Sequence, residues 1–412
     1  MNTVTLRNVS RYTSRGISPK YIESDGLLVL NQKCIRNQKI DLGPARLTDS
    51  SKKFNDEKRL RKFDILINST GVGTLGRIAQ LKFDLDATVD SHVTIFRPAE
   101  ITPDGKSKLD PLFIGYSVRS QEEFIESLGA GATGQTELSK DSILDGVVIQ
   151  LPDYKIQAGI GLALSAYDDL IENNEKRIKI LEETTERLYR EWFVNFKFAG
   201  HKKVKLVESG TEYGKIPEGW GVKRLNDLCE YIGRGVSPKY DEESQNIVLN
   251  QKCVRGHRVS FDSSRRQSKK VSAEKLIKFG DVLICSTGVG TLGRVAQIYD
   301  NYKNCTADSH VSIVRAGNDV NIDYLGLVML SKERSFTEQG KGSTGQTELS
   351  RDAIQETKML YPPLELQKLF SEKVTSSRKI VINLAYRSVL LSQARDLLIP
   401  QLVTGRREFK IL

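Results

Sequence analysis

The most constraining feature of this 412-residue sequence is that it contains one domain twice. Five motifs recur in the same order, each 211 to 219 residues after its first occurrence. They are SPKY (18–21 and 237–240), LNQKC (30–34 and 249–253), STGVGTLGR (69–77 and 286–294), DSHV (90–93 and 308–311) and TGQTELS (133–139 and 344–350). A period this long indicates a tandem duplication rather than a solenoid. Each copy is long enough to bury a core of its own.

Within each copy, short segments rich in β-branched residues alternate with turn residues. FDILINST (63–70) and HVTIFR (92–97) have this pattern, and so do their repeats GDVLICST (280–287) and HVSIVR (310–315). Such segments predict strands joined by turns. We therefore expect each copy to be an α+β domain with an antiparallel or mixed sheet.

A long helix is predicted after each copy. In 155–195, residues recur at alternating steps of four and three, as in a coiled coil: Ile160, Leu164, Tyr167, Ile171, Asn174, Ile178, Leu181, Thr185, Leu188 and Trp192. A patchier seam runs from Phe370 to Leu398 in a second helix that we expect Pro400 to end. The simplest arrangement pairs the two helices, and Asn174 would then fix their register. The alternative is that each helix packs on its own domain as an ordinary amphipathic helix.

The predicted architecture is two α+β domains, each followed by a long coiled-coil helix. The expected divisions are 1–154 for the first domain, 155–198 for the central helix, 199–364 for a linker with the second domain, and 365–412 for the C-terminal helix.

Composition limits the possible partners and the location. A net charge of +10 fits a polyanionic partner without proving one. The chain has neither an apolar stretch of membrane-spanning length nor a signal-like N-terminus, so we expect a cytoplasmic protein without membrane contact. The five cysteines are scattered without a CxxC pair, and the four histidines show no ligand spacing, so no metal site is predicted.

Several motifs imitate catalytic sites but lack a necessary part. Gly71–Gly76 and Gly288–Gly293 match GxGxxG, yet a strand is expected after them where a dinucleotide site needs a helix. The glycine-rich segments 129–136 and 340–347 have glutamine where a phosphate-binding loop has lysine. The DSH triplets at 90–92 and 308–310 contain residue types of a catalytic triad. Consecutive residues of a strand point to opposite faces, so these side chains cannot form a catalytic proton relay, and hydrogen bonding at the strand end is favoured. We expect no catalytic residue in this chain.

A duplicated, basic, non-catalytic chain with helical spacers is typical of a bipartite reader of a long polyanion. Nine Lys/Arg against four Asp/Glu lie in 36–62, and eight against two lie in 255–278. Such stretches suit phosphate contacts, although a solvated surface loop is the alternative. The arginine that ends each STGVGTLGR loop could pair with guanine or phosphate, and the glutamine of TGQTELS with adenine or with its own turn. The DNA-binding candidates are Lys33, Arg36, Ser69, Thr70, Thr74, Arg77 and Gln135, with Lys252, Arg255, Ser286, Thr287, Thr291, Arg294 and Gln346 in the second copy.

The order of these parts resembles the DNA specificity subunit of type I restriction-modification systems, over essentially the whole chain. The most telling segments are EWFVNF (191–196), the restart PEGW (217–220), the ending LIPQL (398–402) and the two GVGTLGR loops. The first domain departs from this pattern because it lacks PEGW and begins at Val4–Val9, which aligns with Val222–Asp227.

This resemblance implies a subunit that performs no chemistry itself. It would bind double-stranded DNA, two methyltransferase subunits that methylate adenine with S-adenosylmethionine, and restriction subunits that use ATP and Mg. Each copy would be a target-recognition domain that reads half of a split target. The two long antiparallel coiled-coil helices would relate these domains by a pseudo-twofold axis, set the spacer and dock the methyltransferases. Trp192, Phe193 and Phe196 would either cap the coil or contact a partner.

The two copies are nearly identical in every motif, whereas the two domains usually differ within this family. We therefore expect similar, inverted half-sites. Two competing hypotheses are a stand-alone bipartite DNA-binding scaffold or regulator, and a nuclease or methylase with an unrecognised active site.

Overall fold

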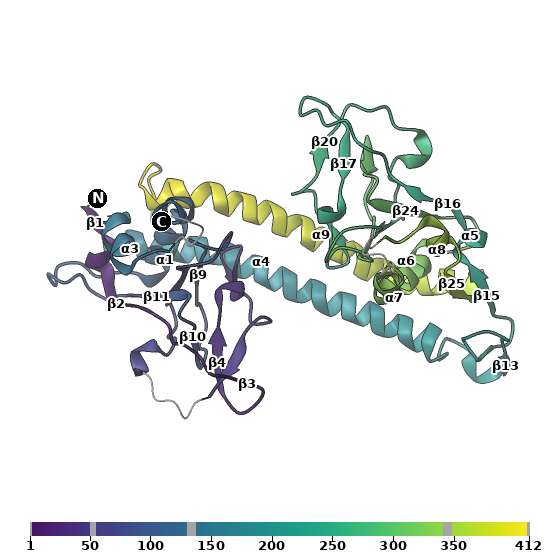
Figure 1. The fold of residues 1–412 in the computed structure, drawn as a ribbon, viewed down its shortest axis with the longest axis horizontal. Coiled ribbons are helices and arrows are strands. Elements are labelled where there is room, and N and C mark those ends of the chain that lie inside the picture. Colours follow the sequence, from purple (N-terminus) through teal and green to yellow (C-terminus); the bar gives the residue numbers. More distant parts are fainter. Residues whose placement is uncertain (1, 50–54, 130–136, 341–347, 410–412) are drawn as a thin grey trace. The chain divides into compact units, whose positions relative to one another are not determined.

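The fold is that of a computed structural model, which describes residues 2–49, 55–129, 137–340 and 348–409. The chain forms two compact units, one made of Met1–Glu175 with Tyr386–Leu412 and the other of Lys176–Ala385. The helices α4 (Tyr154–Tyr189) and α9 (Leu364–Val403) each contribute a segment to both units (Figure 1). The predicted domain boundaries follow the repeats, whereas these units follow spatial contacts.

The main sheet of the first unit is antiparallel and built from the segments predicted as strands. Its order is β2 (Ser10–Arg15), β11 (Val93–Pro98), β8 (Ile65–Asn68) and β9 (Ile78–Gln80). All four residues of β8 are buried. Three short helices accompany this sheet: α1 (Pro111–Arg119), α2 (Glu122–Ser127) and α3 (Lys140–Gly146). Apolar side chains of β8 and α1 share one core.

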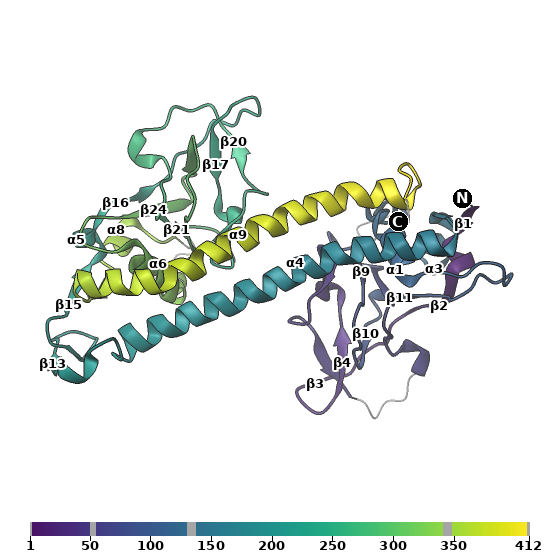
Figure 2. The ribbon, with the colours of Figure 1, turned by 180° about the vertical axis from the view of Figure 1, so that it is seen from behind.

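A smaller mixed sheet, with a second apolar core between it and the main sheet, completes this unit. Its order is β10 (Ala87–Val89), β4 (Leu27–Leu30), β7 (Arg46–Thr48) and β3 (Tyr21–Ile22), with β10 parallel to β4. Two further antiparallel pairs are β1 (Asn2–Thr5) with β12 (Val148–Leu151), and β5 (Ile35–Arg36) with β6 (Lys39–Ile40). In both views β3 and β4 project away from α4 of the same unit (Figures 1 and 2).

The second unit repeats most of these elements in the same order, but its smaller sheet has three strands instead of four. Its main sheet is β16 (Cys229–Arg234), β24 (Val311–Ala316), β21 (Val282–Cys285) and β22 (Val295–Gln297), and its smaller sheet is β20 (Arg265–Arg266), β17 (Ile247–Leu249) and β23 (Cys305–Ala307). The pairs β15 (Gly221–Arg224) with β25 (Lys358–Tyr361), β18 (Val254–Arg255) with β19 (Arg258–Val259), and β13 (Leu206–Glu208) with β14 (Lys215–Pro217) lie beside them. The helices are α5 (Leu225–Leu228), α6 (Ile322–Ser331), α7 (Glu333–Gln339) and α8 (Arg351–Gln355).

The starts of the two copies are equivalent at a slightly different register from the one expected. The 3-10 turn Leu6–Val9 follows β1 as α5 follows β15, so that Leu6 corresponds to Leu225. Both leucines are completely buried. The structural alignment is thus shifted by one residue from the match of Val4 with Val222, because burial of these leucines fixes the register.

The two long helices run antiparallel within the first unit. Ile160 and Leu164 near the start of α4 share a core with Ile399, Leu402 and Val403 near the end of α9. The same core includes α1, so these helix segments pack both on each other and on the domain. The first unit therefore combines the two arrangements considered from the sequence: the helices pair with each other, and they also pack on the domain.

The expectation that Pro400 ends the second helix is wrong. Helix α9 continues through Pro400 to Val403. Proline removes one backbone hydrogen bond and strains the preceding turn. Leu402 and Val403 are only 6% and 3% exposed in the core of the first unit, and this burial favours the additional helical turn.

A buried ionic cluster fixes the first domain to the helices. Asp168 of α4 contacts Lys82 at 2.6 Å, Arg119 at 3.0 Å and Arg395 of α9 at 2.6 Å. The Tyr116 hydroxyl donates to the same carboxylate at 2.6 Å. Burial alone would raise the pKa of Asp168, but Arg119 and Lys82 outweigh it and hold the pKa well below its usual value. The position in α9 equivalent to Asp168 is Arg378, which pairs with Asp323 in the second unit.

Candidate nucleic-acid interface

The STGVGTLGR segment forms the loop of a β-hairpin in each unit. Between β8 and β9, the amide of Gly76 donates to the Asn68 carbonyl at 2.8 Å, and the amide of Asn68 donates to the Arg77 carbonyl at 2.9 Å. A strand follows the glycines in both copies, at β9 and at β22. The prediction that a strand follows these glycines, where a dinucleotide site has a helix, is therefore confirmed.

One residue at the base of each loop must be glycine, because of its backbone conformation and its close contact with a neighbouring helix. Gly76 has a φ of +78°, and a Cβ there would lie 2.6 Å from the Glu126 Cα. Gly293 has a φ of +83°, and its Cβ would lie 2.8 Å from the Thr337 Cα. The loop base is thus pressed against α2 or α7 in its own unit.

The LNQKC motif lies beside this loop, although more than 30 residues separate the two in the sequence of each copy. The Asn68 side chain donates to the Gln32 carbonyl at 3.0 Å, and the Thr74 hydroxyl oxygen lies 3.4 Å from the Gln32 side-chain oxygen. In the second unit, the Cys285 thiol contacts the Gln251 carbonyl at 3.7 Å. Two repeated motifs therefore form one surface in each copy.

Four of the predicted basic residues are exposed on this surface. Lys33 and Lys252 follow the glutamines just described, and Arg36 and Arg255 lie on the adjoining hairpin strands β5 and β18. Within the described residues, none of the four forms an ion pair with a carboxylate. Their positive charge is therefore available to an anionic partner.

Ser69 and Ser286 need a correction, because both are completely buried. Ser69 is hydrogen-bonded to Thr94 at 2.5 Å, and Ser286 to Ser312 at 2.6 Å, between the hydroxyl oxygens. These serines join neighbouring strands of the main sheets. As the chain is folded, their hydroxyls cannot reach DNA.

The threonines of the loop are partly buried and mostly stabilise it. Thr70 Oγ1 lies 2.7 Å from His92 Nδ1, and Thr287 Oγ1 lies 2.7 Å from His310 Nδ1. Thr74 and Thr291 direct their hydroxyls to carbonyls of the same loop, at Gly71 and Gly288, both at 3.3 Å.

The DSH motifs end their strands as the sequence suggested. The amide of His92 donates to the Asp90 carboxylate at 3.0 Å, and that of His310 to Asp308 at 2.9 Å. Burial raises the pKa of both aspartates, although these amide hydrogen bonds oppose the shift. The prediction of strand-end hydrogen bonding is confirmed.

The two loop arginines fold back on their own loops. Arg77 donates to the Gly73 carbonyl and Arg294 to the Gly290 carbonyl, each at 2.6 Å. Both arginines are partly exposed. One nitrogen of each thus holds the loop tip, while the exposed remainder of the group can still accept a polar partner.

Valine at the loop tip was not among the predicted site residues. Val72 is 89% exposed and Val289 is 98% exposed. An apolar side chain presented to solvent in both copies is suited to contact with a base methyl group. Its position between two glycines in both repeats was the available sequence signal.

Gln135 and Gln346 lie outside the described residues.

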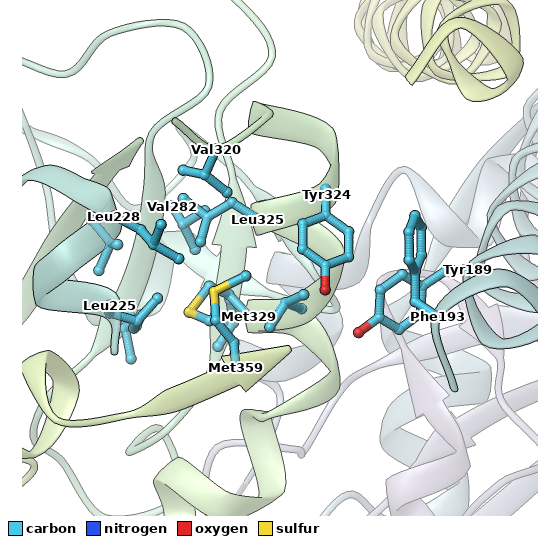
Figure 3. Packing of buried hydrophobic residues seen from close by; sticks show 14 of the residues in the cluster. Tyr189, Phe193, Leu225, Leu228, Val282, Val320, Tyr324, Leu325, Met329 and Met359 are labelled. Atoms are coloured by element: carbon cyan, nitrogen blue, oxygen red, sulfur yellow. The ribbon is translucent and has the colours of Figure 1, made fainter. Parts of the chain in front are cut away.

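Trp192, Phe193 and Phe196 belong to the core of the second unit. Trp192 and Phe193 are 7% and 1% exposed, and Phe196 packs edge-on against Trp220 at 5.4 Å between ring centroids. Figure 3 shows Phe193 and Tyr189 directed at Tyr324 of α6, and the Phe193 and Tyr324 rings are 4.6 Å apart. The structure favours the interpretation that these residues cap the helix. The prediction that Trp192 and Phe193 contact a partner is corrected, because both side chains are buried in the core of the second unit.

Neither a metal site nor a membrane span is found in the described part of the chain. No group of three or more His, Cys, Asp or Glu side chains there is arranged to hold a metal ion. None of the helices in those same ranges combines the length and apolar character needed to cross a membrane.

Comparison with known proteins gives a consistent set of similarities. Residues 217–383 match the family model described as Type I restriction modification DNA specificity domain. The chain is 26% identical to the Type I restriction enzyme MjaIX specificity subunit of Methanocaldococcus jannaschii, over 71% of this chain and 68% of the relative. It is 22% identical to the Type I restriction enzyme HindI specificity subunit of Haemophilus influenzae, over 97% of both.

One solved structure has a similar fold. The S subunit of the Type-I restriction-modification system from M. genitalium superposes with a TM-score of 0.60, covering 99% of this chain and 96% of that chain. The sequence identity is 17%, so the similarity concerns the fold.

Proposed function

We propose that the chain reads a bipartite DNA target, because residues 217–383 match the model of type I restriction modification DNA specificity domains and the whole chain is similar to a type I specificity subunit. Each copy of the duplicated domain would read one half-site. The helices α4 and α9 would set the unread spacer and dock two methyltransferase subunits.

One observation carries this proposal. In each unit the LNQKC motif and the STGVGTLGR loop are packed together, with an exposed lysine, an exposed arginine and an exposed valine on the same surface. Cations at such a surface suit phosphate contacts, and the loop tip suits base contacts. Two such surfaces in one chain are what a split target requires.

The chemistry would reside in other subunits. We expect S-adenosylmethionine in the methyltransferase subunits, and ATP with Mg in restriction subunits. The contribution of this chain would be binding and orientation. Turnover by the purified chain alone would contradict this assignment, and tight sequence-specific binding without any methyltransferase would favour a stand-alone scaffold or regulator.

The two half-sites are proposed to be similar and inverted, because the surface motifs are nearly identical in both copies. Long-read sequencing of a host that expresses this chain with its methyltransferase gives the methylated motif directly. A near-palindromic split motif supports the proposal. Two unrelated half-sites would contradict the prediction of similar, inverted half-sites, but the target would still be bipartite.

Arg77 and Arg294 provide a matched pair for assigning half-sites. We expect Arg77→Ala to weaken recognition of one half-site and Arg294→Ala to weaken the other, measured with DNA in which each half is altered in turn. Each variant serves as the control for the other, because both lose the same contact to a loop carbonyl. Loss that is uniform across sequences would make these arginines phosphate contacts.

A further inference from the structure

An arginine is stacked on a tyrosine at the same place in both units. The guanidinium carbon of Arg46 lies 3.6 Å from the centre of the Tyr21 ring, and that of Arg265 lies 3.5 Å from the centre of the Tyr240 ring. Both tyrosines end the repeated SPKY motif, which none of the contacts described so far explains. The chain has thus kept the pair in two copies.

The backbone around each tyrosine is held firmly. In the first unit, the Lys58 ammonium donates to the Gly16 carbonyl at 2.7 Å, and the Asp49 amide donates to the Lys20 carbonyl at 3.0 Å. In the second unit, Lys275 donates to the Gly235 carbonyl at 3.1 Å.

Gly16 also touches the neighbouring strand so closely that a Cβ there would lie 2.0 Å from the Val89 carbonyl oxygen. At Gly235 the corresponding distance, to the Ala307 carbonyl oxygen, is 1.9 Å. The SPKY segments are therefore fixed against β10 and β23, and each tyrosine is a preset platform for its arginine.

Both pairs are accessible. Arg46 and Arg265 are exposed, and Tyr240 is 46% exposed. They lie on the smaller sheet of each unit, which projects away from the long helices of that unit in both views (Figures 1 and 2).

Exposed basic residues lie beside both pairs, and in the second unit the acidic residues 241–243 follow the tyrosine. Lys20 and Lys239 precede the tyrosines, and the side chain of Lys20 is 74% exposed although its ammonium lies 3.6 Å from the Asp49 carboxylate. Arg266 and Lys269 extend the exposed positive surface in the second unit. One carboxylate approaches a stacked arginine, Glu242 at 3.5 Å from Arg265, and such an exposed pair is easily exchanged.

Stacking changes what an arginine can do. A guanidinium laid on an aromatic face keeps its plane fixed while the N–H groups along its edge stay free for an acceptor. A planar fork of this kind matches two oxygens of one phosphate. A lysine next to it adds attraction without requiring a particular base.

We propose that Arg46 on Tyr21 and Arg265 on Tyr240 are phosphate clamps, each gripping the DNA backbone at one half-site. This inference rests on the proposed function and deepens it. The clamps fix the register of each domain on the duplex, while the STGVGTLGR loops face the bases.

The test measures DNA binding by the complex of this chain with its methyltransferase, at several salt concentrations, on DNA with and without the methylated motif. Arg46→Ala and Arg265→Ala are each expected to weaken binding about tenfold by the same factor on both DNAs, and to reduce the slope of log affinity against log salt by about 1. Arg46→Lys is expected to lose part of the affinity, because lysine keeps the charge without the fork.

Two controls separate the clamp from other effects. Arg334→Ala removes an equal charge from α7, where the side chain is 91% exposed, and should leave the salt slope unchanged. Tyr21→Leu keeps Arg46 but removes its platform, and should weaken binding as Arg46→Lys does. If Arg334→Ala weakens DNA binding as much as Arg46→Ala does, the arginines act only through the net charge of the protein, and the proposal is overturned.

The failure of this inference is distinguishable from failure of the proposed function. If the wild-type complex binds its motif and both arginine variants match it at every salt concentration, only the clamps are overturned. If the variants change the preference at one base pair with an unchanged salt slope, the arginines read bases and the phosphate assignment is wrong. If the wild-type complex binds no DNA, both the function and the clamps are overturned.

Discussion

The side chain of Asn174 on α4 donates a hydrogen bond to the hydroxyl of Ser388 on α9, with 3.2 Å between the two atoms. Both residues occupy seam positions that are otherwise mainly apolar, and Asn174 is only 8% exposed. A buried polar pair of this kind lowers stability but restricts the helices to one register, since any shift leaves the amide without its partner.

We predict that Asn174→Leu raises the stability of the first unit by about 1 kcal/mol and loosens the register of the helix pair. Thermal unfolding gives the first quantity, and cysteine crosslinking across the seam gives the second. Asn174→Ser is the control, because it keeps a polar group at the same position. A fall in melting temperature for the leucine variant would show that packing rather than register determines this position.

The pair Asp64 and Arg97 should be essential for the first domain. Arg97 donates two hydrogen bonds of 2.8 Å to the Asp64 carboxylate, and the side chains of Arg97 and Asp64 are 6% and 0% exposed. Asp64→Ala removes the fully buried partner of this cation and leaves it only the half-exposed carboxylate of Glu57, at 2.7 Å, so we expect a loss of about 3 kcal/mol in urea unfolding.

The matched control is Asp86→Ala, which removes an exposed carboxylate that is 2.6 Å from Arg59 and should cost about 1 kcal/mol or less. The equivalent pair in the second unit, Asp281 and Arg315, should behave as the first pair does. Equal losses for Asp64→Ala and Asp86→Ala would contradict this account.

The Asp168 cluster predicts acid lability. Burial opposes ionisation of Asp168, but Arg119 and Lys82 prevail and its pKa in the fold is depressed. A depressed carboxyl pKa contributes stability that is present above the unfolded value of about 3.9 and is lost as pH falls toward the folded value. The melting temperature should therefore fall from about pH 5 downward, and Asp168→Asn should flatten that fall while lowering stability at neutral pH.

Melting temperature measured between about pH 3 and pH 8 tests this prediction. Asp396→Asn is the control, because Asp396 also contacts Arg395 but is 58% exposed. Parallel pH profiles for the wild type and Asp168→Asn would show that other carboxylates cause the acid sensitivity.

Two glycines of one loop should respond differently to alanine. Gly73 has a φ of +70° and open space within 4 Å of where a Cβ would lie, whereas Gly76 has a φ of +78° and the Glu126 backbone 2.6 Å from that position. Gly73→Ala should cost about 1–2 kcal/mol, from backbone strain alone. Gly76→Ala should cost more, because α2 must also move.

Thermal unfolding compares the two variants, and Gly290→Ala with Gly293→Ala repeats the comparison in the second unit. Identical destabilisation by the two members of a pair would mean that the close approach of the loop base to the helix does not matter for stability.

The sequence by itself determined the plan of the molecule. The duplication, the strands around Ile65–Asn68 and Val93–Pro98, the strand after each glycine loop and the helical seams all follow from the order of residue types along the chain. The strands and seams depend on spacings of two to four residues, which a linear sequence displays directly.

Tertiary structure alone decided which side chains are accessible. Ser69 and Trp192 looked suited to binding and are buried, the helix continues through Pro400, and Tyr21 meets Arg46 across the smaller sheet. Each of these outcomes depends on contacts between segments far apart in the chain. Local spacing carries no information on such contacts, because burial is a property of the packed neighbours rather than of the residue.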